Sequence, residues 1–372
     1  MKRIYPNYLP QFRCLAGDCP DTCCKDWQII LDPATLARYR TLDGALGRDV
    51  RAALVTEDGQ TRFRLTDGRC PLLTEDGLCR IQRALGEAAL CTTCRCHPRF
   101  TEEYGQTREV SLSLSCPAAA SLILGCETPV TLVTETDDAP VTEYNALDPA
   151  LYLALVSIRA QLFSILREDA LPINERLGLM LLLCARAQRL LDEKRYGRID
   201  PLLRRFSSPG RRARALARIR RLLRRPADYF PCWLILKNME HLTQEFDALL
   251  DAYDAAAPAC GGLSPVQEEN LAFYFIFRHI LKAVNDAKLL ARMESCVFHV
   301  LSIRTLCQGA SDETARRRVA ALYSKEVEHS DDNCAMLLRL LGRGTPRLGR
   351  LISMLASGCN SSQLFRPAHV QS

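Results

Sequence analysis

Cysteine is the residue type in this sequence whose number and spacing could support chemistry. The chain has 372 residues and 18 cysteines, and 11 of these cysteines lie within the first 126 residues. Thiolates at short spacings bind zinc, hold iron–sulfur clusters or form disulfides. In chain order they are Cys14, Cys19, Cys23, Cys24, Cys70, Cys79, Cys91, Cys94, Cys96, Cys116 and Cys126.

The first group, Cys14 to Cys24, places four thiols within eleven residues. The glycine, aspartate and proline residues between them favour turns that can fold the sulfurs inward. Cys23 and Cys24 are adjacent, with Cα atoms about 3.8 Å apart, which is shorter than the preferred span of a disulfide. We therefore expect one of the two to face a metal and the other to pack.

Two further groups have spacings suited to a metal site. Cys70 and Cys79 flank an Asp-Gly turn, so a short hairpin would bring their sulfurs toward a common centre. Cys91-x2-Cys94 is a metal-type spacing by itself, and Cys96-His97 follows it. Any single cysteine could be a buried, inert thiol, but this alternative explains the whole set poorly.

Composition favours reduced thiols over a disulfide framework. Disulfide-dense chains are usually short secreted domains, whereas 372 residues with 48% hydrophobic composition can bury a large core. The N-terminus has no apolar stretch of the signal-peptide kind. The longest apolar run, residues 177–185, is far shorter than the 18 or more residues of a membrane span. We expect a cytoplasmic protein that either is soluble or contacts a membrane peripherally.

Local patterns divide the chain in two. The acidic, turn-forming segment before Pro149 reads as a linker, so we expect a cysteine-rich metal or iron–sulfur module over 1–135, a linker over 136–149 and a helical domain over 150–372. In the module, alternation predicts strands over 109–115 and 130–133. Proline at a first helical turn predicts helices from Pro33 and over 117–124.

Beyond the linker, apolar residues recur at intervals of three and four. The predicted fold class is mainly α, an N-terminal cysteine-rich α+β metal-binding module followed by an α-helical domain. The helices expected in the second part cover 151–166, 174–196, 233–250, 265–292, 296–306, 312–327 and 331–341.

Several of these segments carry a resemblance to a known family. The segments are 14–27 (CLAGDCPDTCCKDW), 70–81 (CPLLTEDGLCRI), 94–99 (CRCHPR) and 113–117 (SLSCP). In order and spacing they resemble the successive motifs of the flagellin lysine-N-methylases. The first three are also similar to a broader group of small zinc- or iron-chelating cysteine domains. The resemblance extends more loosely to residues 270–278.

The resemblance implies a bacterial cytosolic enzyme that methylates surface lysines of flagellin. It implies S-adenosylmethionine as methyl donor and a [4Fe–4S] cluster, with zinc instead of the cluster or beside it as an alternative. Cys91 and Cys96 stand where the family pattern does not require cysteine, and His97 stands where an aromatic residue is expected. Cys126 is an accessory or structural candidate. The cysteines that match the family, and are therefore the expected metal ligands, are Cys14, Cys19, Cys23, Cys24, Cys70, Cys79, Cys94 and Cys116.

Eight matching cysteines exceed the four that one cluster normally uses. A lone cluster, a cluster with a zinc ion and a pair of centres all stay open, with Cys19, Cys23, Cys24 and Cys94 as first candidates for cluster ligands. The sequence has neither CxxxCxxC nor a GxGxxG loop. It therefore does not show where the methyl donor binds or which residues are catalytic.

A lysine amine with a pKa near 10.4 is protonated at neutral pH, so polar methyl transfer needs a neighbouring base or desolvation. A requirement for an iron–sulfur cluster would indicate a redox or radical step, or a structural role for the metal.

Arg278 interrupts an apolar run, so its charge must be paired or reach solvent. It could bind the carboxylate of the methyl donor, although a structural salt bridge is the stronger interpretation. We assign it provisionally as a cofactor-binding residue. Five cysteines on apolar helix faces are expected in the core: Cys184, Cys232, Cys296, Cys307 and Cys334.

Between Arg204 and Arg225 there are ten arginines and no acidic residue, with apolar residues at helical spacing. A basic amphipathic helix of this kind suits an anionic membrane surface, and a solvated surface helix is the plain alternative. Nucleic acid is a weaker candidate because the net charge is only +6.

Flagellin is the expected protein partner, and homo-oligomerisation stays open. The rival function is a non-catalytic zinc- or iron-binding module with a helical partner-binding domain.

Overall fold

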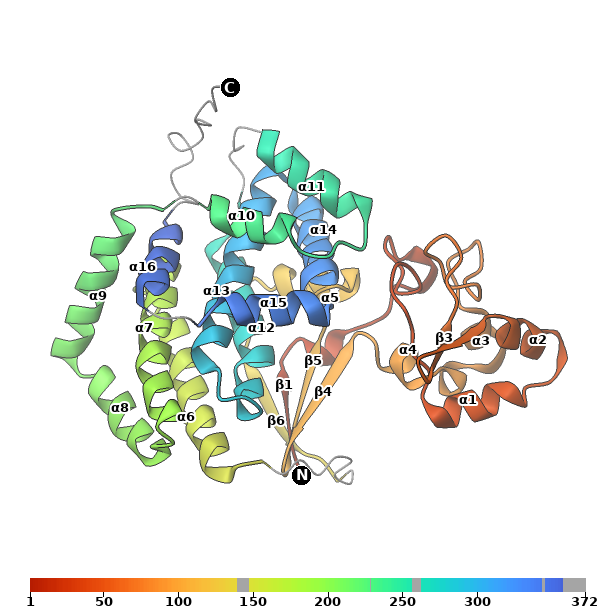
Figure 1. Ribbon diagram of the computed structural model, residues 1–372, viewed down its shortest axis with the longest axis horizontal. Coiled ribbons are helices and arrows are strands. Elements are labelled where there is room, and N and C mark those ends of the chain that lie inside the picture. The colour runs from red at the N-terminus through yellow and green to blue at the C-terminus, as the bar shows by residue number, and fades with distance from the viewer. Residues whose placement is uncertain (139–146, 228, 256–261, 343–344, 357–372) are drawn as a thin grey trace.

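The computed structural model describes residues 1–138, 147–227, 229–255, 262–342 and 345–356, and it is mainly helical with a small sheet (Figure 1). The strands of this sheet are β1 (Lys2–Pro6), β4 (Arg99–Tyr104), β5 (Thr107–Leu112) and β6 (Leu132–Thr136), in the order β4-β5-β1-β6. β1 runs parallel to β5 and antiparallel to β6. The predicted fold class is thus confirmed at the level of a mainly α chain with an α+β N-terminal part.

The helical body packs against this sheet. Its central helices are α5 (Pro117–Gly125), α6 (Pro149–Leu166), α7 (Ile173–Asp192), α12 (Pro265–His279) and α13 (Leu289–Leu306). Around them lie α8 (Ile199–Phe206), α9 (Pro209–Leu223), α10 (Phe230–Lys237), α11 (Gln244–Ala255), α14 (Glu313–Tyr323), α15 (Asp331–Leu340) and α16 (Thr345–Met354). A π-helical turn, Ser324–Glu328, continues α14.

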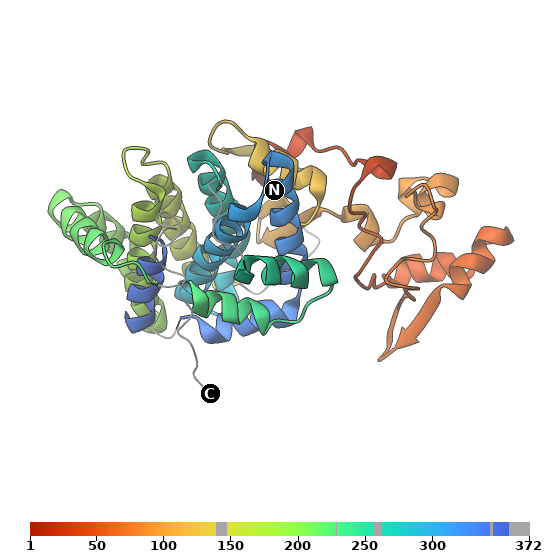
Figure 2. The same ribbon diagram turned by 90° about the horizontal axis from the view of Figure 1, so that it is seen from above.

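A small lobe projects from one side of this body (Figures 1 and 2). It holds α1 (Pro33–Arg40), α2 (Gly44–Ala52), α3 (Arg80–Leu85), α4 (Thr92–Cys96) and the hairpin of β2 (Leu54–Glu57) and β3 (Gln60–Phe63). Asp32 caps α1 as expected, because its carboxylate accepts the Thr35 N–H at 2.9 Å. The lobe core has only eleven buried apolar side chains, and two of them are Cys70 and Cys91. A core this small gains much from a metal cross-link.

Apolar packing does not follow the predicted boundary at 136–149. Leu112 of β5 and Leu155 of α6 belong to one hydrophobic cluster, which spans the sheet and the helical body. A buried ion pair adds to this contact, because Arg159 of α6 pairs with Glu109 of β5. The side chains that form a separate cluster are those of the small lobe, between Ile29 and Cys94. The division at 136–149 remains a prediction about folding units, and part of that linker lies outside the described residues.

Four predicted helices are wrong in extent. The helix expected over 174–196 ends at Asp192, and the helix expected over 296–306 begins at Leu289. The helix expected over 265–292 ends at His279, and α13 begins at Leu289 because Ala287 adopts a left-handed φ of 55° and Asp286 accepts the Lys288 N–H. The helix expected over 233–250 is interrupted between α10 and α11. There the buried Glu326 accepts the Leu242 N–H and the Thr243 hydroxyl, which competes with helix continuation.

α6 is long and apolar enough, by length and composition, to cross a membrane. In the structure it is a packed helix that contacts α7, α8 and α12. Leu155, Ile158 and Leu162 are fully buried in the main core. The core helix of a soluble protein passes the same test of length and composition.

Candidate functional site

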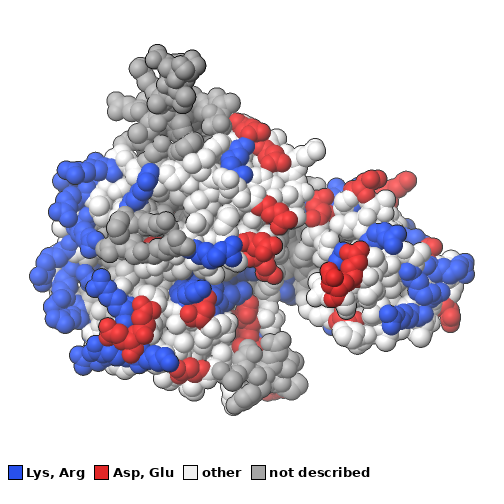
Figure 3. Space-filling view, in the orientation of Figure 1, with Lys and Arg blue, Asp and Glu red and all other residues white. Residues whose placement is uncertain are grey.

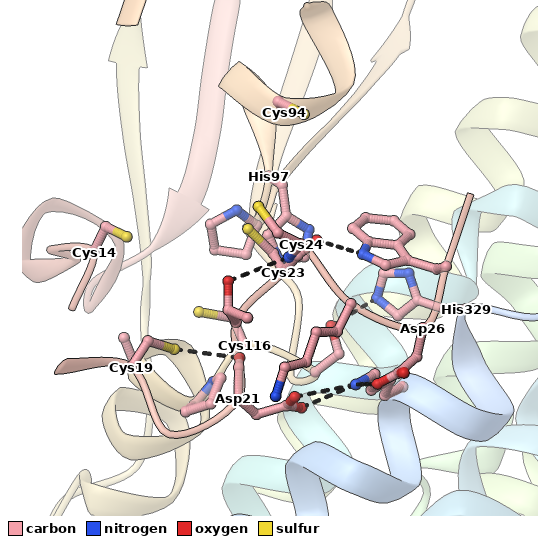
Figure 4. Close-up of a pocket in the computed structure, with 18 of the residues that line it drawn as sticks. Cys14, Cys19, Asp21, Cys23, Cys24, Asp26, Cys94, His97, Cys116 and His329 are labelled. Atoms are coloured by element: carbon pink, nitrogen blue, oxygen red, sulfur yellow. Dashed lines mark hydrogen bonds and ion pairs between the residues drawn. The ribbon is translucent and has the colours of Figure 1, made fainter. Parts of the chain in front are cut away.

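A cavity of about 810 Å³ lies between the small lobe and the helical body. Its walls come from parts of segments 12–28, 77–99 and 115–118, and from residues that run from the π-helical turn to the start of α15. The remaining lining residues outside the first three segments are Leu65, Glu240, Leu242, Lys325, His329, Ser330, Asp331 and Asp332. Figure 4 shows Cys23 and Cys24 near the centre of this close-up, with Cys14 and Cys19 on one side and His329 and Asp26 on the other. Segments far apart in the sequence thus meet around one space.

Seven of the eight predicted metal ligands line this cavity. The exception is Cys70, which is buried in the core of the small lobe. Of the remaining N-terminal cysteines, Cys96 is exposed and Cys126 donates to the Leu122 carbonyl. All cysteines in the described part of the chain are free thiols. The seven cavity cysteines are Cys14, Cys19, Cys23, Cys24, Cys79, Cys94 and Cys116.

Cys91 is a candidate that the family pattern did not include. It is 1% exposed in the lobe core beside Cys70, with Cys24, Cys79 and Cys94 packed against that core. Its spacing to Cys94 was the sequence signal that could have found it. Five cysteines thus lie in or against the lobe core, namely Cys24, Cys70, Cys79, Cys91 and Cys94. The other cavity cysteines, Cys14, Cys19, Cys23 and Cys116, do not belong to this core.

Two pairs of cysteines each share a hydrogen bond between their thiols. The Cys94 thiol donates to the Cys91 sulfur, and this hydrogen bond lowers the pKa of Cys91 to about 7 although burial opposes the shift. The Cys23 thiol lowers the pKa of Cys24 to about 7 in the same way. Hydrogen bonds to the charged form favour it, so each contact favours the thiolate form of the accepting cysteine, Cys91 or Cys24. Thiolates are the form that binds metals.

The donor set fits an iron–sulfur cluster in type and number, because seven thiols line the cavity and a cluster uses four. As the side chains stand, no three His, Cys, Asp or Glu residues in the described ranges converge closely enough to hold one metal ion. Metal binding at this site therefore requires the thiols to turn toward a common centre.

The wall beside Cys23 and Cys24 is built from rings. The Trp27 indole lies 5.1 Å from the His97 ring and 5.8 Å from the His329 ring, measured between centroids. Phe100 packs on His329 at 5.5 Å. Burial, together with the nearby His329, lowers the pKa of His97 to about 4. His97 thus occupies the place where an aromatic residue was expected, and it is uncharged at neutral pH.

His329 is held by two serines of the 113–117 motif. Its Nε2 lies 2.6 Å from Ser113 Oγ and 3.0 Å from Ser115 Oγ, while Nδ1 has no hydrogen-bond partner among the described residues. Burial lowers the pKa of His329 below its ordinary value, although Glu328 opposes this shift. A neutral imidazole with one unpartnered nitrogen in a cavity can accept a proton.

A buried polar network supports the turn that carries His329. Glu328 accepts the Ser324 and Tyr274 hydroxyls at 2.6 and 2.9 Å, and it pairs with Arg278 at 3.3 Å. His279 lies 3.1 Å from the same carboxylate. Although burial alone would raise it, the pKa of Glu328 is held well below its ordinary value by Arg278 and His279.

Arg278 forms a structural ion pair with Glu328, which is the stronger of the two interpretations made from the sequence. It is 8% exposed, and its guanidinium also lies 4.2 Å from the Phe100 ring centroid. Arg278 does not line the cavity, so its assignment to the methyl donor stays a prediction. The expected core positions of Cys184, Cys232, Cys296 and Cys307 are confirmed, while Cys334 is half-buried.

Lys325 joins the helical body to the cysteine segment. It lies on the π-helical turn, lines the cavity and pairs with Asp21 at 3.1 Å and with Asp26 at 2.9 Å. Sequence reasoning missed Lys325 and His329, and it gave Ser113 no role although the residue lies in the 113–117 motif. The spacing of polar residues at 324–330 resembles an ordinary helix end, so no local signal pointed to Lys325 or His329.

The fold and the site together define a mainly helical protein with a thiol-lined cavity. Comparison with known proteins shows the family to which such a protein belongs. The sequence profile described as "FliB lysine N-methylase C-terminal domain" matches residues 159–354. The chain belongs to the FliB lysine N-methylase family. No solved structure matches the chain.

Curated relatives agree with this assignment. "Flagellar biosynthetic protein FliU" of Salmonella muenchen is 36% identical over 126 residues, which cover 32% of this chain and 75% of that protein. The proteins named "Lysine-N-methylase" of Salmonella typhimurium and Salmonella choleraesuis are each 33% identical over 131 residues. These matches cover 32% of this chain and 31% of each relative, so the chain aligns with about a third of their length.

Proposed function

We propose that the protein is a lysine N-methyltransferase that transfers methyl groups from S-adenosylmethionine to lysines of flagellin in the cytoplasm. The observation that carries the proposal is the family match over residues 159–354. The name of the relative FliU, a flagellar biosynthetic protein, supports flagellin as the substrate. The cavity of about 810 Å³ is large enough for a small molecule such as S-adenosylmethionine, because small-molecule sites usually measure roughly 300–1,000 Å³.

The cavity cysteines would hold an iron–sulfur cluster, with Cys19, Cys23, Cys24 and Cys94 as its first candidates. When bound, a [4Fe–4S] cluster supplies an electron-transfer centre or a Lewis-acidic iron. Cys70 and Cys91 are buried in the lobe core, away from the cavity wall. A cluster in the cavity would therefore take its ligands from the other cysteines.

His329 is the residue we assign as the base. A substrate lysine enters as an ammonium and must lose a proton before its nitrogen can attack the methyl group. In the tautomer with its proton on Nε2, which lies 2.6 Å from Ser113 Oγ, the imidazole takes the proton of the lysine nitrogen at Nδ1. The N–CH₃ bond then forms as the S–CH₃ bond of the donor breaks, and the electron pair leaves with the sulfur as a neutral thioether.

Cysteine variants connect the metal to the activity. We expect Cys23→Ala and Cys94→Ala, purified without oxygen, to lose iron and visible absorption and to lose transfer of labelled methyl from S-adenosylmethionine to flagellin. Cys126→Ala is the matched control, because that thiol is half-buried outside the cavity lining. Folded Cys23→Ala and Cys94→Ala proteins with undiminished iron and activity would contradict the ligand assignment. A colourless protein that contains only zinc would favour the rival, non-catalytic function.

A further inference from the structure

A lysine ammonium is already bound in the cavity. Lys325 Nζ lies 3.1 and 3.2 Å from the two carboxylate oxygens of Asp21 and 2.9 Å from Asp26 Oδ2. The Lys325 side chain is only 12% exposed. Three carboxylate oxygens match the three donors of an ammonium group, so this wall has the composition and geometry of a receptor for a lysine side chain.

Other groups of the candidate site line the same cavity as the pair. Trp27 follows Asp26 directly and lies beside His329, so an aromatic ring and an imidazole line this cavity. Lys325 and His329 come from one π-helical turn and its end, a kind of turn that is frequent at functional sites. Asp26 has a left-handed φ of 66°, a conformation that costs free energy in a non-glycine residue.

We propose that Asp21 and Asp26 form the pocket that receives the ε-ammonium of the substrate lysine, and that Lys325 fills this pocket when no substrate is bound. The inference rests on the proposed function, since it names the place where that enzyme binds its lysine. A substrate side chain displaces Lys325 and gains the same three hydrogen bonds. His329 lines the same cavity and receives the proton.

A purely structural ion pair makes a different prediction. If Lys325 only fastened residues 21–26 to the helical body, removing the lysine and removing the carboxylates would have the same effect, because each breaks the same contact. If Lys325 competes with the substrate, the two changes have opposite effects on lysine binding. The sign of the Lys325 variant therefore separates the two interpretations.

The test is binding of a short peptide with one central lysine to the full-length protein without methyl donor. It is measured by calorimetry and by tryptophan fluorescence, with the acetyl-lysine peptide as the neutral probe. We expect Lys325→Met to bind the lysine peptide about threefold or more tightly. Asp21→Asn and Asp26→Asn should bind it about tenfold or more weakly, because hydrogen bonds to charged groups are the strong ones. None should change the weak binding of the neutral peptide.

The matched control is Lys282→Met, which breaks an ion pair with Glu102 of 2.9 Å outside the cavity lining. It should leave peptide binding unchanged. Weaker or unchanged binding by folded Lys325→Met would overturn the proposal, and so would unchanged binding by Asp21→Asn, whose half-exposed side chain makes this variant the least disruptive. This test measures peptide binding and not methyl transfer. If the protein binds the lysine peptide but transfers no methyl group in the separate activity assay, the proposed function is contradicted and the lysine pocket stands.

Discussion

At the scale of single residues, His329 is the cavity side chain that we assign as the base. Its Nε2 is fixed by Ser113 and Ser115, and burial lowers the pKa of the ring below its ordinary value. We predict that His329→Gln, which retains a polar contact to the serines but cannot accept a proton, lowers kcat for methyl transfer by about 10²-fold or more. Thermal unfolding checks that the variant is folded.

The pH dependence of the same activity follows from the direction of the pKa shift. Because the folded-state pKa of His329 lies below its ordinary value, the base stays neutral at pH values where free histidine is already protonated. The acid limb of the wild-type profile of kcat/KM should therefore lie below about pH 6.5. A folded His329→Gln variant with wild-type kcat and the same acid limb would exclude His329 as the base.

His299 makes a prediction about stability. It is 2% exposed, its Nδ1 lies 2.8 Å from the Tyr323 hydroxyl, and burial with the nearby His279 lowers its pKa to about 3. Unfolded His299 binds a proton near pH 6.5, so the free energy of unfolding should fall as the pH decreases below that value. The expected loss is roughly 2 kcal/mol between pH 6.5 and 4.5.

Urea unfolding of wild type and His299→Gln at the two pH values measures this contribution. The variant has no proton to bind at this position, so its free energy of unfolding should fall less on acidification. Equal losses in both proteins would show that His299 does not remain neutral in the folded state.

At the scale of elements, the contact between β5 and α6 determines whether sheet and helices unfold together. The ion pair of Arg159 with Glu109 is buried, with side-chain exposures of 7% and 5%. Removing one partner leaves an uncompensated charge, so Arg159→Met should destabilise the protein by about 3–5 kcal/mol. The double variant Arg159→Met with Glu109→Leu should recover much of this loss.

Urea denaturation followed by circular dichroism and by tryptophan fluorescence tests this coupling. One transition that shifts as a whole would show that sheet and helices form one unit. Loss of the sheet alone in Arg159→Met would support the division at 136–149 instead.

Patterns within one element could be predicted from the sequence, and contacts between elements could not. Apolar periodicity was sufficient for α6 and for the beginning of α12 at Pro265, where Ser264 caps the helix. The interruption between α10 and α11 depends on Glu326, a residue more than 80 positions away. Likewise, Arg278 could be recognised as needing a partner, but its partner Glu328 could be identified only from the folded chain.

The candidate site shows the same limit. The resemblance to the flagellin lysine-N-methylases named eight cysteines, and seven of them line one cavity. The opposite wall comes from Lys325 and His329, whose neighbours in sequence are unremarkable and whose partners Asp21 and Ser113 lie more than 200 positions away. No local pattern encodes such a contact.

At the scale of the whole molecule, the arginine-rich helices lie on the opposite side of the body from the small lobe (Figures 1 and 3). In this basic surface, Arg212 pairs with Glu168 and Arg220 with Glu175, while the others have no carboxylate partner among the described residues. Those others are Arg204, Arg205, Arg211, Arg214, Arg218, Arg221, Arg224 and Arg225, and all are exposed. A surface of this kind fits anionic lipid headgroups.

We predict that the protein binds vesicles containing phosphatidylserine and that added salt weakens the binding. The variant Arg214→Ser/Arg218→Ser/Arg221→Ser should bind about 10²-fold more weakly, at about 1 kcal/mol per arginine. The control Arg40→Ser/Arg48→Ser/Arg64→Ser removes the same charge from the small lobe and should have little effect. Equal losses of vesicle binding in both variants, or no vesicle binding by the wild type, would show that the basic surface is a solvated surface without a membrane partner.

The most direct test of the account is transfer of labelled methyl from S-adenosylmethionine to purified flagellin by the anaerobically purified, iron-loaded protein, with the labelled residue identified by mass spectrometry. The account predicts label on lysine side chains of flagellin in the wild-type reaction and none with Cys23→Ala. Iron-loaded wild-type protein that leaves flagellin lysines unlabelled would contradict it.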